Sequence, residues 1–164
     1  MVIDLSEFRP TIVIDTREQT PLTFTRLPAV RGSLMTGDYS AKGSERDFCV
    51  ERKSVDDLVK CCLDSWRDRF CRELHRMRGF RFRRLLIVGL EQDIVLGNYR
   101  SKIQPESVLH SLAAWECRYG VPFVFRATPE SAAQQVESWA SWYVREWIFT
   151  ARNIHRGLMK EENI

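Results

Sequence analysis

The segment DFCVERKSVDDL, residues 47–58, constrains the fold more than any other part of this chain. Alternate residues of a β-strand point to the same side, so Glu51 and Lys53 would share one face of a strand here. Ser54 is a favourable helix N-cap, and Asp57 stands three residues later in a capping-box arrangement. The segment therefore predicts a strand that runs directly into a helix, with an acid and a lysine side by side near the junction.

The rest of the chain alternates between short apolar runs typical of strands and longer periodic segments typical of helices. We expect strands over residues 11–15, 33–40, 47–53, 83–89 and 121–127, helices over 54–77, 105–120 and 129–150, and irregular segments at 21–32 and 91–104. In the first helix, apolar residues recur at helical spacing: Leu58, Cys62, Trp66, Phe70, Leu74 and Met77. This order predicts a single α/β domain over residues 1–164, with its core at about 11–150 and a mixed central sheet of about five strands flanked by helices.

Composition excludes several classes of protein. With 44% hydrophobic residues the chain is not disordered, and a net charge of +3 gives no general argument for nucleic-acid binding. The five cysteines contain no CxxC pair, which argues against a disulfide framework and a zinc ribbon. The N-terminus is not a signal peptide, and the longest apolar run, residues 85–90, is too short to span a bilayer. We therefore expect a soluble, cytoplasmic protein with no membrane partner.

A second acid should lie beside Glu51. Asp38 falls at the end of a predicted strand, and Gly43 allows a turn that would bring Asp38 next to Glu51. Two adjacent carboxylates suit Mg²⁺ or Mn²⁺, and Lys53 beside them could orient or deprotonate a water, or neutralise charge on a phosphate. A solvated surface hairpin would explain the same spacing without a metal. Two acids that follow the first core strand favour the metal site: Asp15 and Glu18.

Three motifs together carry a family resemblance: IDTRE at residues 14–18, GDY at 37–39 and ERKSVDDL at 51–58. They resemble the XPF-type family of structure-specific DNA endonucleases, whose signature is GD, a variable gap, ERK, three residues and D. The resemblance covers roughly residues 11–145 and implies a restriction-endonuclease-like fold. It also implies metal-dependent hydrolysis of phosphodiester bonds in DNA, at branches, flaps or forks.

The resemblance implies a role for the matched acids and the lysine. Asp38 and Glu51 are expected to be the principal ligands of Mg²⁺ or Mn²⁺. Asp15 and Glu18 would complete the acidic site, directly or through water, and Lys53 would be the catalytic lysine.

Two other residues of the signature each have two interpretations. Arg52 points away from the face of Glu51 and Lys53 if the strand is regular, so it forms a structural ion pair or serves the site and its DNA. Asp57 either caps its own helix or contributes to the site.

Arginine dominates residues 67–84, where only Asp68 and Glu73 oppose it. A solvated helix face with internal ion pairs, such as Asp68 with Arg72, is one interpretation. The acids are too few to pair the arginines, so we favour a surface that contacts DNA phosphates beside the acidic cluster. The expected DNA-binding residues are Arg17, Arg67, Arg69, Arg72 and Arg76.

The final predicted helix is rich in aromatic residues. Trp139, Tyr143 and Trp147 share one face, while Trp142 lies away from it. A core-facing stripe explains most of them, and the large aromatic area also suits a homodimer contact, which the family resemblance implies.

Two rival functions follow from the same sequence. A catalytically silent DNA-binding or scaffolding partner of another nuclease is disfavoured because every catalytic position of the motif is filled. A sequence-specific restriction-type enzyme is disfavoured because no separate recognition module is visible. Only about a dozen residues follow the last predicted helix, so we expect no helix-hairpin-helix module.

Overall fold

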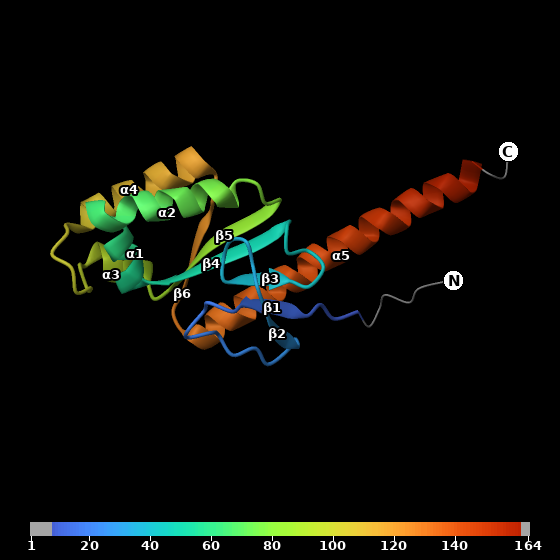
Figure 1. Cartoon of the computed structure of the whole chain (residues 1–164), viewed down its shortest axis with the longest axis horizontal. Coiled ribbons are helices and arrows are strands. Elements are labelled where there is room, and N and C mark those ends of the chain that lie inside the picture. Colours follow the sequence, from blue (N-terminus) through green and yellow to red (C-terminus); the bar gives the residue numbers. More distant parts are fainter. Residues whose placement is uncertain (1–7, 162–164) are drawn as a thin grey trace.

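The computed structural model describes residues 8–161, and its centre is a mixed six-stranded sheet (Figure 1). In sheet order the strands are β2 (Ala29–Gly32), β1 (Ile12–Asp15), β3 (Tyr39–Ala41), β4 (Phe48–Ser54), β5 (Phe82–Val88) and β6 (Phe123–Arg126). β1 is parallel to β2 and antiparallel to β3, β3 is antiparallel to β4, and β4, β5 and β6 are mutually parallel. The predicted α/β architecture is confirmed, with one strand more than expected.

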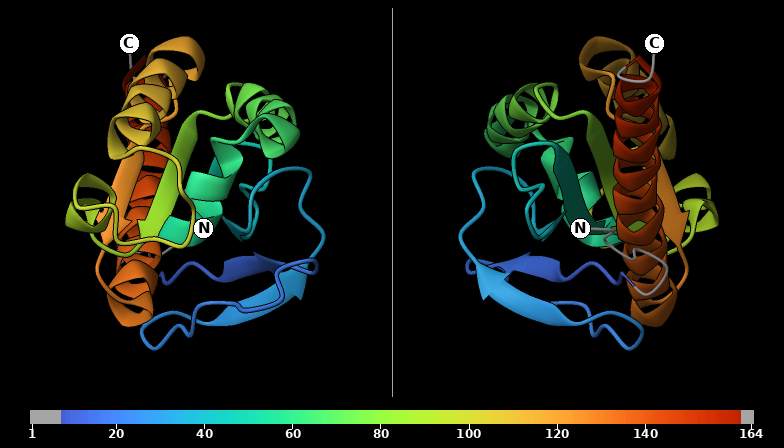
Figure 2. Two further views of the ribbon diagram at one scale, coloured as in Figure 1. Left: turned by 90° about the vertical axis from the view of Figure 1, so that its left-hand side faces the viewer. Right: turned by 90° about the vertical axis from the view of Figure 1, so that its right-hand side faces the viewer.

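The helices cover the two faces of the sheet unequally (Figure 2). α5 (Pro129–Glu161) lies on one face. The opposite face is covered by α1 (Val55–Cys61), α2 (Asp64–Met77), α3 (Glu91–Val95) and α4 (Pro105–Tyr119). The alternation of side chains along β4 explains the two layers, because Cys49 points into the core beneath these four helices and Val50 points into the core beneath α5.

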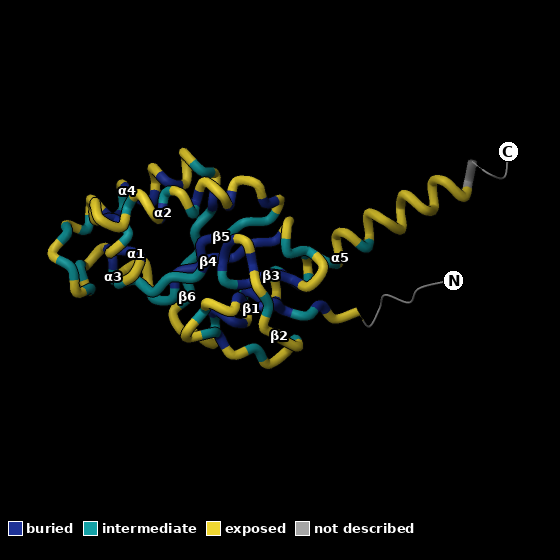
Figure 3. The backbone as a smooth tube through the Cα atoms, in the orientation of Figure 1, coloured by how far each residue is buried: buried dark blue, intermediate teal, exposed yellow. Residues whose placement is uncertain are grey.

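The last helix extends well beyond the sheet (Figures 1 and 3). We expected it to end near residue 150, but it continues to Glu161, because residues 151–161 contain no proline and Gly157 alone does not stop it. All residues from 149 to 159 are exposed. No helix in the described part of the chain is both long enough and apolar enough to cross a membrane.

The single helix predicted over residues 54–77 is two helices. α1 ends at Cys61 and α2 begins at Asp64, because Leu63 between them is extended, with φ −84° and ψ 144°. The apolar periodicity continues across the break, so the sequence pattern does not reveal it. The change of direction alters which side chains are covered: Phe70 is buried, whereas Trp66 is 42% exposed.

Three further segments differ from the sequence-based expectation. Residues 29–32, expected to be irregular, form β2, which pairs with β1 through its backbone while its side chains are mostly exposed. Only Tyr39–Ala41 in the region of the predicted strand 33–40 is paired in the sheet. α3 forms within the expected loop 91–104, and its five residues are too few to show helical periodicity.

A buried acid on α5 fastens the irregular segment that precedes β2. Oε1 of Glu137 accepts hydrogen bonds from the backbone N–H groups of Thr25 (2.9 Å), Arg26 (2.7 Å) and Leu27 (3.1 Å). Glu137 is 2% exposed, and hydrogen bonds to a carboxylate are stronger than those between neutral groups. One side chain therefore satisfies three backbone donors that no sheet or helix pairs, and it links the edge of the sheet to α5.

We expect Glu137→Ala to lower the free energy of unfolding by about 3 kcal/mol, because three partly buried N–H groups lose their acceptor. Urea unfolding of the two proteins measures this difference. Glu146→Ala removes an exposed acid from the same helix and should change the stability far less. Equal effects of the two substitutions would contradict the proposed role of Glu137.

Candidate active site

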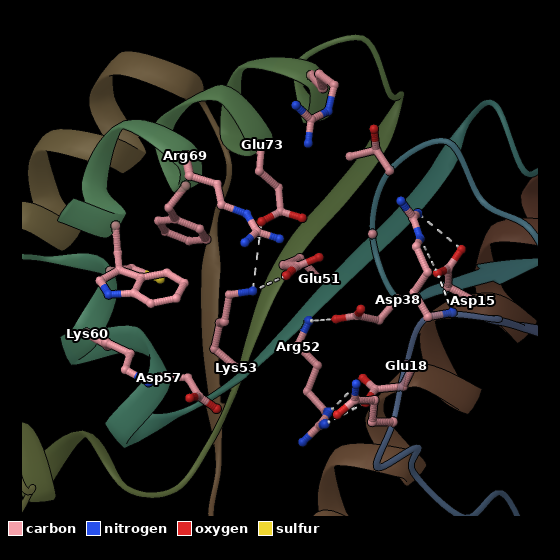
Figure 4. A pocket seen from close by; sticks show the side chains of 18 of the residues that line it. Asp15, Glu18, Asp38, Glu51, Arg52, Lys53, Asp57, Lys60, Arg69 and Glu73 are labelled. Atoms are coloured by element: carbon pink, nitrogen blue, oxygen red, sulfur yellow. Dashed lines mark hydrogen bonds and ion pairs between the residues drawn. The ribbon is translucent and has the colours of Figure 1, made fainter.

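One cavity of about 460 Å³ brings most of the predicted site residues together (Figure 4). It opens beside the C-terminal half of β4, with α2 on one side and the segments around Asp15 and Asp38 on the other. Six acids line it: Asp15, Glu18, Asp38, Glu51, Asp57 and Glu73. Six basic residues line it as well: Arg17, Arg52, Lys53, Lys60, Arg69 and Arg76.

The close approach of two backbone segments places Asp38 next to β4. The Asp38 N–H donates to the carbonyl of Val50 (2.9 Å), and Oδ2 of Asp38 accepts from the backbone N–H of Arg52 (2.8 Å). Gly37 has φ +83°, and a Cβ there would lie 2.6 Å from Sγ of Cys49. The glycine of the GD pair is therefore required both for its conformation and for the space it leaves.

Asp38 and Glu51 form a pair of buried carboxylates whose charge the protein compensates only in part. Burial raises the pKa of Glu51 well above its usual value, and the charge of Asp38 raises it further, while Lys53 opposes both effects. Burial likewise raises the pKa of Asp38 from 3.8 to about 6, opposed by the hydrogen bond from the backbone of Arg52. Such a pair favours a bound cation, because a cation relieves both the burial cost and the repulsion.

These two carboxylates fit a hard divalent ion. Mg²⁺ is commonly bound through one or two carboxylates and keeps several of its waters, which matches the pair Asp38 and Glu51. Among residues 8–161, however, no group of three or more His, Cys, Asp or Glu side chains is arranged to hold a metal. Asp38 and Glu51 are the residues that would hold such an ion.

Lys53 lies between two acids. Its Nζ contacts Oε1 of Glu51 and lies 3.8 Å from Oε2 of Glu73 (Figure 4). Burial would lower the pKa of Lys53, but Glu51 and Glu73 outweigh it and raise the pKa above its usual value. The ammonium is thus kept charged, which suits it to bind a phosphate oxygen better than to accept a proton.

Glu73 was not assigned to the site from the sequence, where it counted only as a charge within the basic segment. Its position on α2 gives the missing signal, because Arg69, Glu73 and Arg76 follow one another at helical spacing and all line the cavity. Trp66 was missed for a different reason: the break between α1 and α2 leaves it exposed at the cavity, which Lys60 of α1 also lines.

The upstream acids line the cavity with their oxygens already engaged. Oδ1 of Asp15 accepts from N and Nε of Arg17 (2.9 and 2.7 Å), and Oδ2 accepts from the backbone N–H of Leu34 (2.7 Å). Burial raises the pKa of Asp15, but these donors outweigh it and lower the pKa overall. Glu18 pairs with Nη2 of Arg52 at 3.0 Å. Both acids therefore hold neighbouring arginines at the cavity.

Arg52 and Asp57 each make the structural contact that the sequence left open. The guanidinium of Arg52 donates to Glu18 and to Oγ1 of Thr20 (2.9 Å), so the ion pair is present. Oγ of Ser54 accepts from the N–H of Asp57 (3.1 Å) and donates to its carboxylate (2.7 Å), so the cap is present as well. Both residues still line the cavity.

The five predicted DNA-binding arginines lie in different surroundings. Arg17 lines the cavity and pairs with Asp15. Arg69 and Arg76 line the cavity and, among the described residues, form no ion pair with a carboxylate. Arg72 lies outside it, in a second depression next to α4, and its anticipated pair with Asp68 is absent from the ion pairs of the described residues. Arg67 lies outside the cavity and contacts α4: it donates to Oγ of Ser111 (2.9 Å), and its guanidinium lies 5.2 Å from the ring centroid of Trp115.

Comparison with known proteins places this arrangement in context. A sequence profile described as the ERCC4 domain matches residues 3–138. The solved structure of XPF from Aeropyrum pernix is similar at a TM-score of 0.64 and 22% identity, covering 84% of this chain and 70% of that one. The structure of the same XPF in complex with DNA is similar at a TM-score of 0.66 and 22% identity, covering 84% and 66%. No curated protein matches this chain in sequence.

These likenesses establish the fold. The chain spans 66% to 70% of the length of the two XPF structures. The restriction-endonuclease-like arrangement expected from the three motifs agrees with the XPF fold, and the family resemblance is confirmed by the match over residues 3–138.

We expect Asp38→Asn to stabilise the metal-free protein at pH 7.5. A carboxyl pKa raised in the folded state means that stability falls as the pH rises from 3.8 to about 6, and this loss persists above pH 6. Asparagine removes the charge but can still accept from the Arg52 N–H, so Tm should rise by about 2–4 °C for roughly 1 kcal/mol.

Thermal unfolding in EDTA measures this shift, and Asp47→Asn, an exposed acid outside the cavity, is the matched control. Added Mg²⁺ should raise the Tm of the wild type and leave that of Asp38→Asn unchanged. A lower Tm for Asp38→Asn in EDTA would show that the carboxylate is a structural residue.

Proposed function

This chain belongs to the ERCC4 domain family, and on that premise we propose that it is a divalent-metal-dependent DNA endonuclease. One observation carries the proposal: Asp38, Glu51 and Lys53 meet in a cavity whose rim holds arginines without acidic partners. Paired carboxylates are suitable ligands for the ion, and the lysine can bind the reacting phosphate. The arginines can bind the neighbouring phosphates of the DNA strand.

Each residue then has a task in phosphodiester hydrolysis. Asp38 and Glu51 would hold Mg²⁺ or Mn²⁺, which would supply Lewis-acid chemistry at the phosphate. Lys53 binds a non-bridging oxygen of the scissile phosphate, and Glu73 helps to hold its ammonium at the cavity. Arg52 and Glu18 brace the strand that carries Glu51.

The substrate we propose is branched, flap or fork DNA. The XPF structure in complex with DNA supports nucleic acid as the partner class, and the family supports hydrolysis of DNA. A homodimer is proposed on separate grounds. Trp147, Ile154 and Leu158 are 42%, 61% and 58% exposed on α5, whereas Trp139 and Tyr143 pack against the core. The three exposed residues recur at helical spacing on one side of α5, which offers an apolar surface for a second copy.

A catalytically silent partner of another nuclease is the alternative. The engaged oxygens of Asp15 and the contact between Lys53 and Glu51 would suit a site that has lost its metal. Against this stands the complete set of Asp38, Glu51 and Lys53, which a silent subunit has no need to retain in a buried and mutually repulsive arrangement.

Cleavage of labelled flap, fork, four-way-junction and plain duplex DNA tests the proposal. We expect cutting in Mg²⁺ or Mn²⁺, none in EDTA, and a loss of at least about 100-fold in Asp38→Asn, because the remaining carboxylate alone holds the ion poorly. Asp47→Asn should cut like the wild type. A wild type that binds these substrates and cuts none of them, in either metal, would favour the silent partner.

Two arginines close together on α2 should differ in their effect on DNA binding. Arg69→Ala should reduce the magnitude of the log–log salt slope by about 0.9, because Arg69 lines the cavity without an acidic partner. Arg67→Ala should leave the slope unchanged and lower Tm instead, because Arg67 joins α2 to α4. Fluorescence anisotropy at several salt concentrations measures the slopes. The reverse pattern would remove the rim of the cavity from the DNA interface.

A further inference from the structure

Trp66 is exposed where the sequence period would bury it. It belongs to the apolar series that continues through Phe70 and Leu74, which are 2% and 1% exposed, yet Trp66 itself is 42% exposed. The break between α1 and α2 places it in the first turns of α2, and it lines the same cavity as Lys53 and Glu51. A large aromatic ring therefore stands at the wall of the candidate active site without a place in the core.

One cation lies over this ring and a second follows it on the helix. Nζ of Lys60 lies 5.2 Å from the ring centroid of Trp66, and Arg69 follows three residues later on the same helix. Neither Lys60 nor Arg69 forms an ion pair with a described carboxylate. An aromatic face flanked by unpaired cations matches a nucleotide, whose base stacks on the ring while its phosphate meets the positive charges.

The position of Trp66 along α2 limits which nucleotide it can reach. Seven residues separate Trp66 from Glu73, the residue of α2 that lies 3.8 Å from Lys53, so the two are roughly 10 Å apart along the helix axis at 1.5 Å per residue. This distance is about three rises of a stacked strand at ~3.4 Å each. A base on Trp66 thus belongs to a nucleotide within about three positions of a phosphate at Lys53.

We propose that Trp66 stacks on an unpaired base within about three nucleotides of the scissile phosphate, and that Lys60 contacts the phosphate of that nucleotide. This inference rests on the proposed nuclease function and names the structural feature that its substrate must have. A paired base has both faces covered by its neighbours in the duplex, so only an unpaired or displaced base can present a face to Trp66. Trp66 thereby selects junctions between single and double strands.

A second copy of the chain is the other partner that could cover an exposed tryptophan. Lys60 and Arg69 argue against it, because a copy that covers Trp66 would place these two cations, for which the described residues provide no carboxylate, in the interface. Nucleic acid supplies the missing negative charge.

The test is an abasic-site scan of a labelled flap substrate, measured by fluorescence anisotropy in EDTA so that binding is observed without cleavage. One nucleotide at a time loses its base, at each of three positions on either side of the junction. For the wild type, one position should weaken binding about tenfold, the size of one lost stacking contact. Trp66→Ala should weaken binding of the intact flap about tenfold and lose sensitivity to the abasic site at that position, while Trp66→Phe should retain part of it.

Trp142→Ala is the matched control, because Trp142 is also exposed (59%) and has Arg145 at 5.1 Å, but lies on α5 and does not line the cavity. It should bind like the wild type and keep the wild-type loss at the abasic site. Equal Tm values for Trp66→Ala and the wild type would confirm that the exposed substitution leaves the fold intact.

Two outcomes would overturn the inference. One is the same loss of binding at the abasic site in Trp66→Ala as in the wild type, so that the two effects add. The other is a change of sedimentation mass in Trp66→Ala with DNA binding unaltered. The last would assign Trp66 to contact with a second copy. The outcome is separable from that of the nuclease proposal. Coupling between Trp66 and one base without any cleavage in Mg²⁺ would contradict the nuclease function and support the base contact. Cleavage without coupling would support the nuclease function and contradict the base contact.

Discussion

The burial of Glu51 beside Asp38 is the constraint on which the rest of the site depends. Burial raises the pKa of both carboxylates, and the charge of Asp38 raises that of Glu51 further, so neighbouring groups must compensate. Lys53 meets Glu51, and the backbone of Arg52 meets Asp38. The antiparallel pairing of β3 with β4 holds the two acids next to each other, so the concentration of negative charge at the site follows from the pairing of these strands.

The cavity separates its charges by depth. Glu51 is almost fully buried, while Arg69 and Lys60 are exposed at the wall formed by α1 and α2. Acids at the centre would repel a phosphate strand, and cations around them offset that repulsion where the strand approaches. The break at Leu63 makes this possible, because it directs the start of α2 and Trp66 across the opening rather than into the core.

Much of this site could be predicted from sequence. The alternation along β4 correctly placed Arg52 opposite Glu51, and Arg52 makes the ion pair that was one of its two interpretations. Glu73 was missed because a single acid among arginines resembles ordinary surface charge until its neighbour Lys53 is known. Arg67 was grouped with the phosphate-binding arginines because composition does not show which side of α2 faces α4.

By itself, the sequence determined the order of the main strands and helices, the strand-to-helix junction after Lys53 and the family of the chain, because these depend on local periodicity, capping and motifs. Tertiary structure alone decided three other things: the edge strand β2, the three backbone bonds to Glu137 and the exposure of Trp66. Each of them depends on which surfaces meet after the chain has folded. Backbone pairing leaves no side-chain pattern, and a helix break without proline or glycine leaves the apolar period intact.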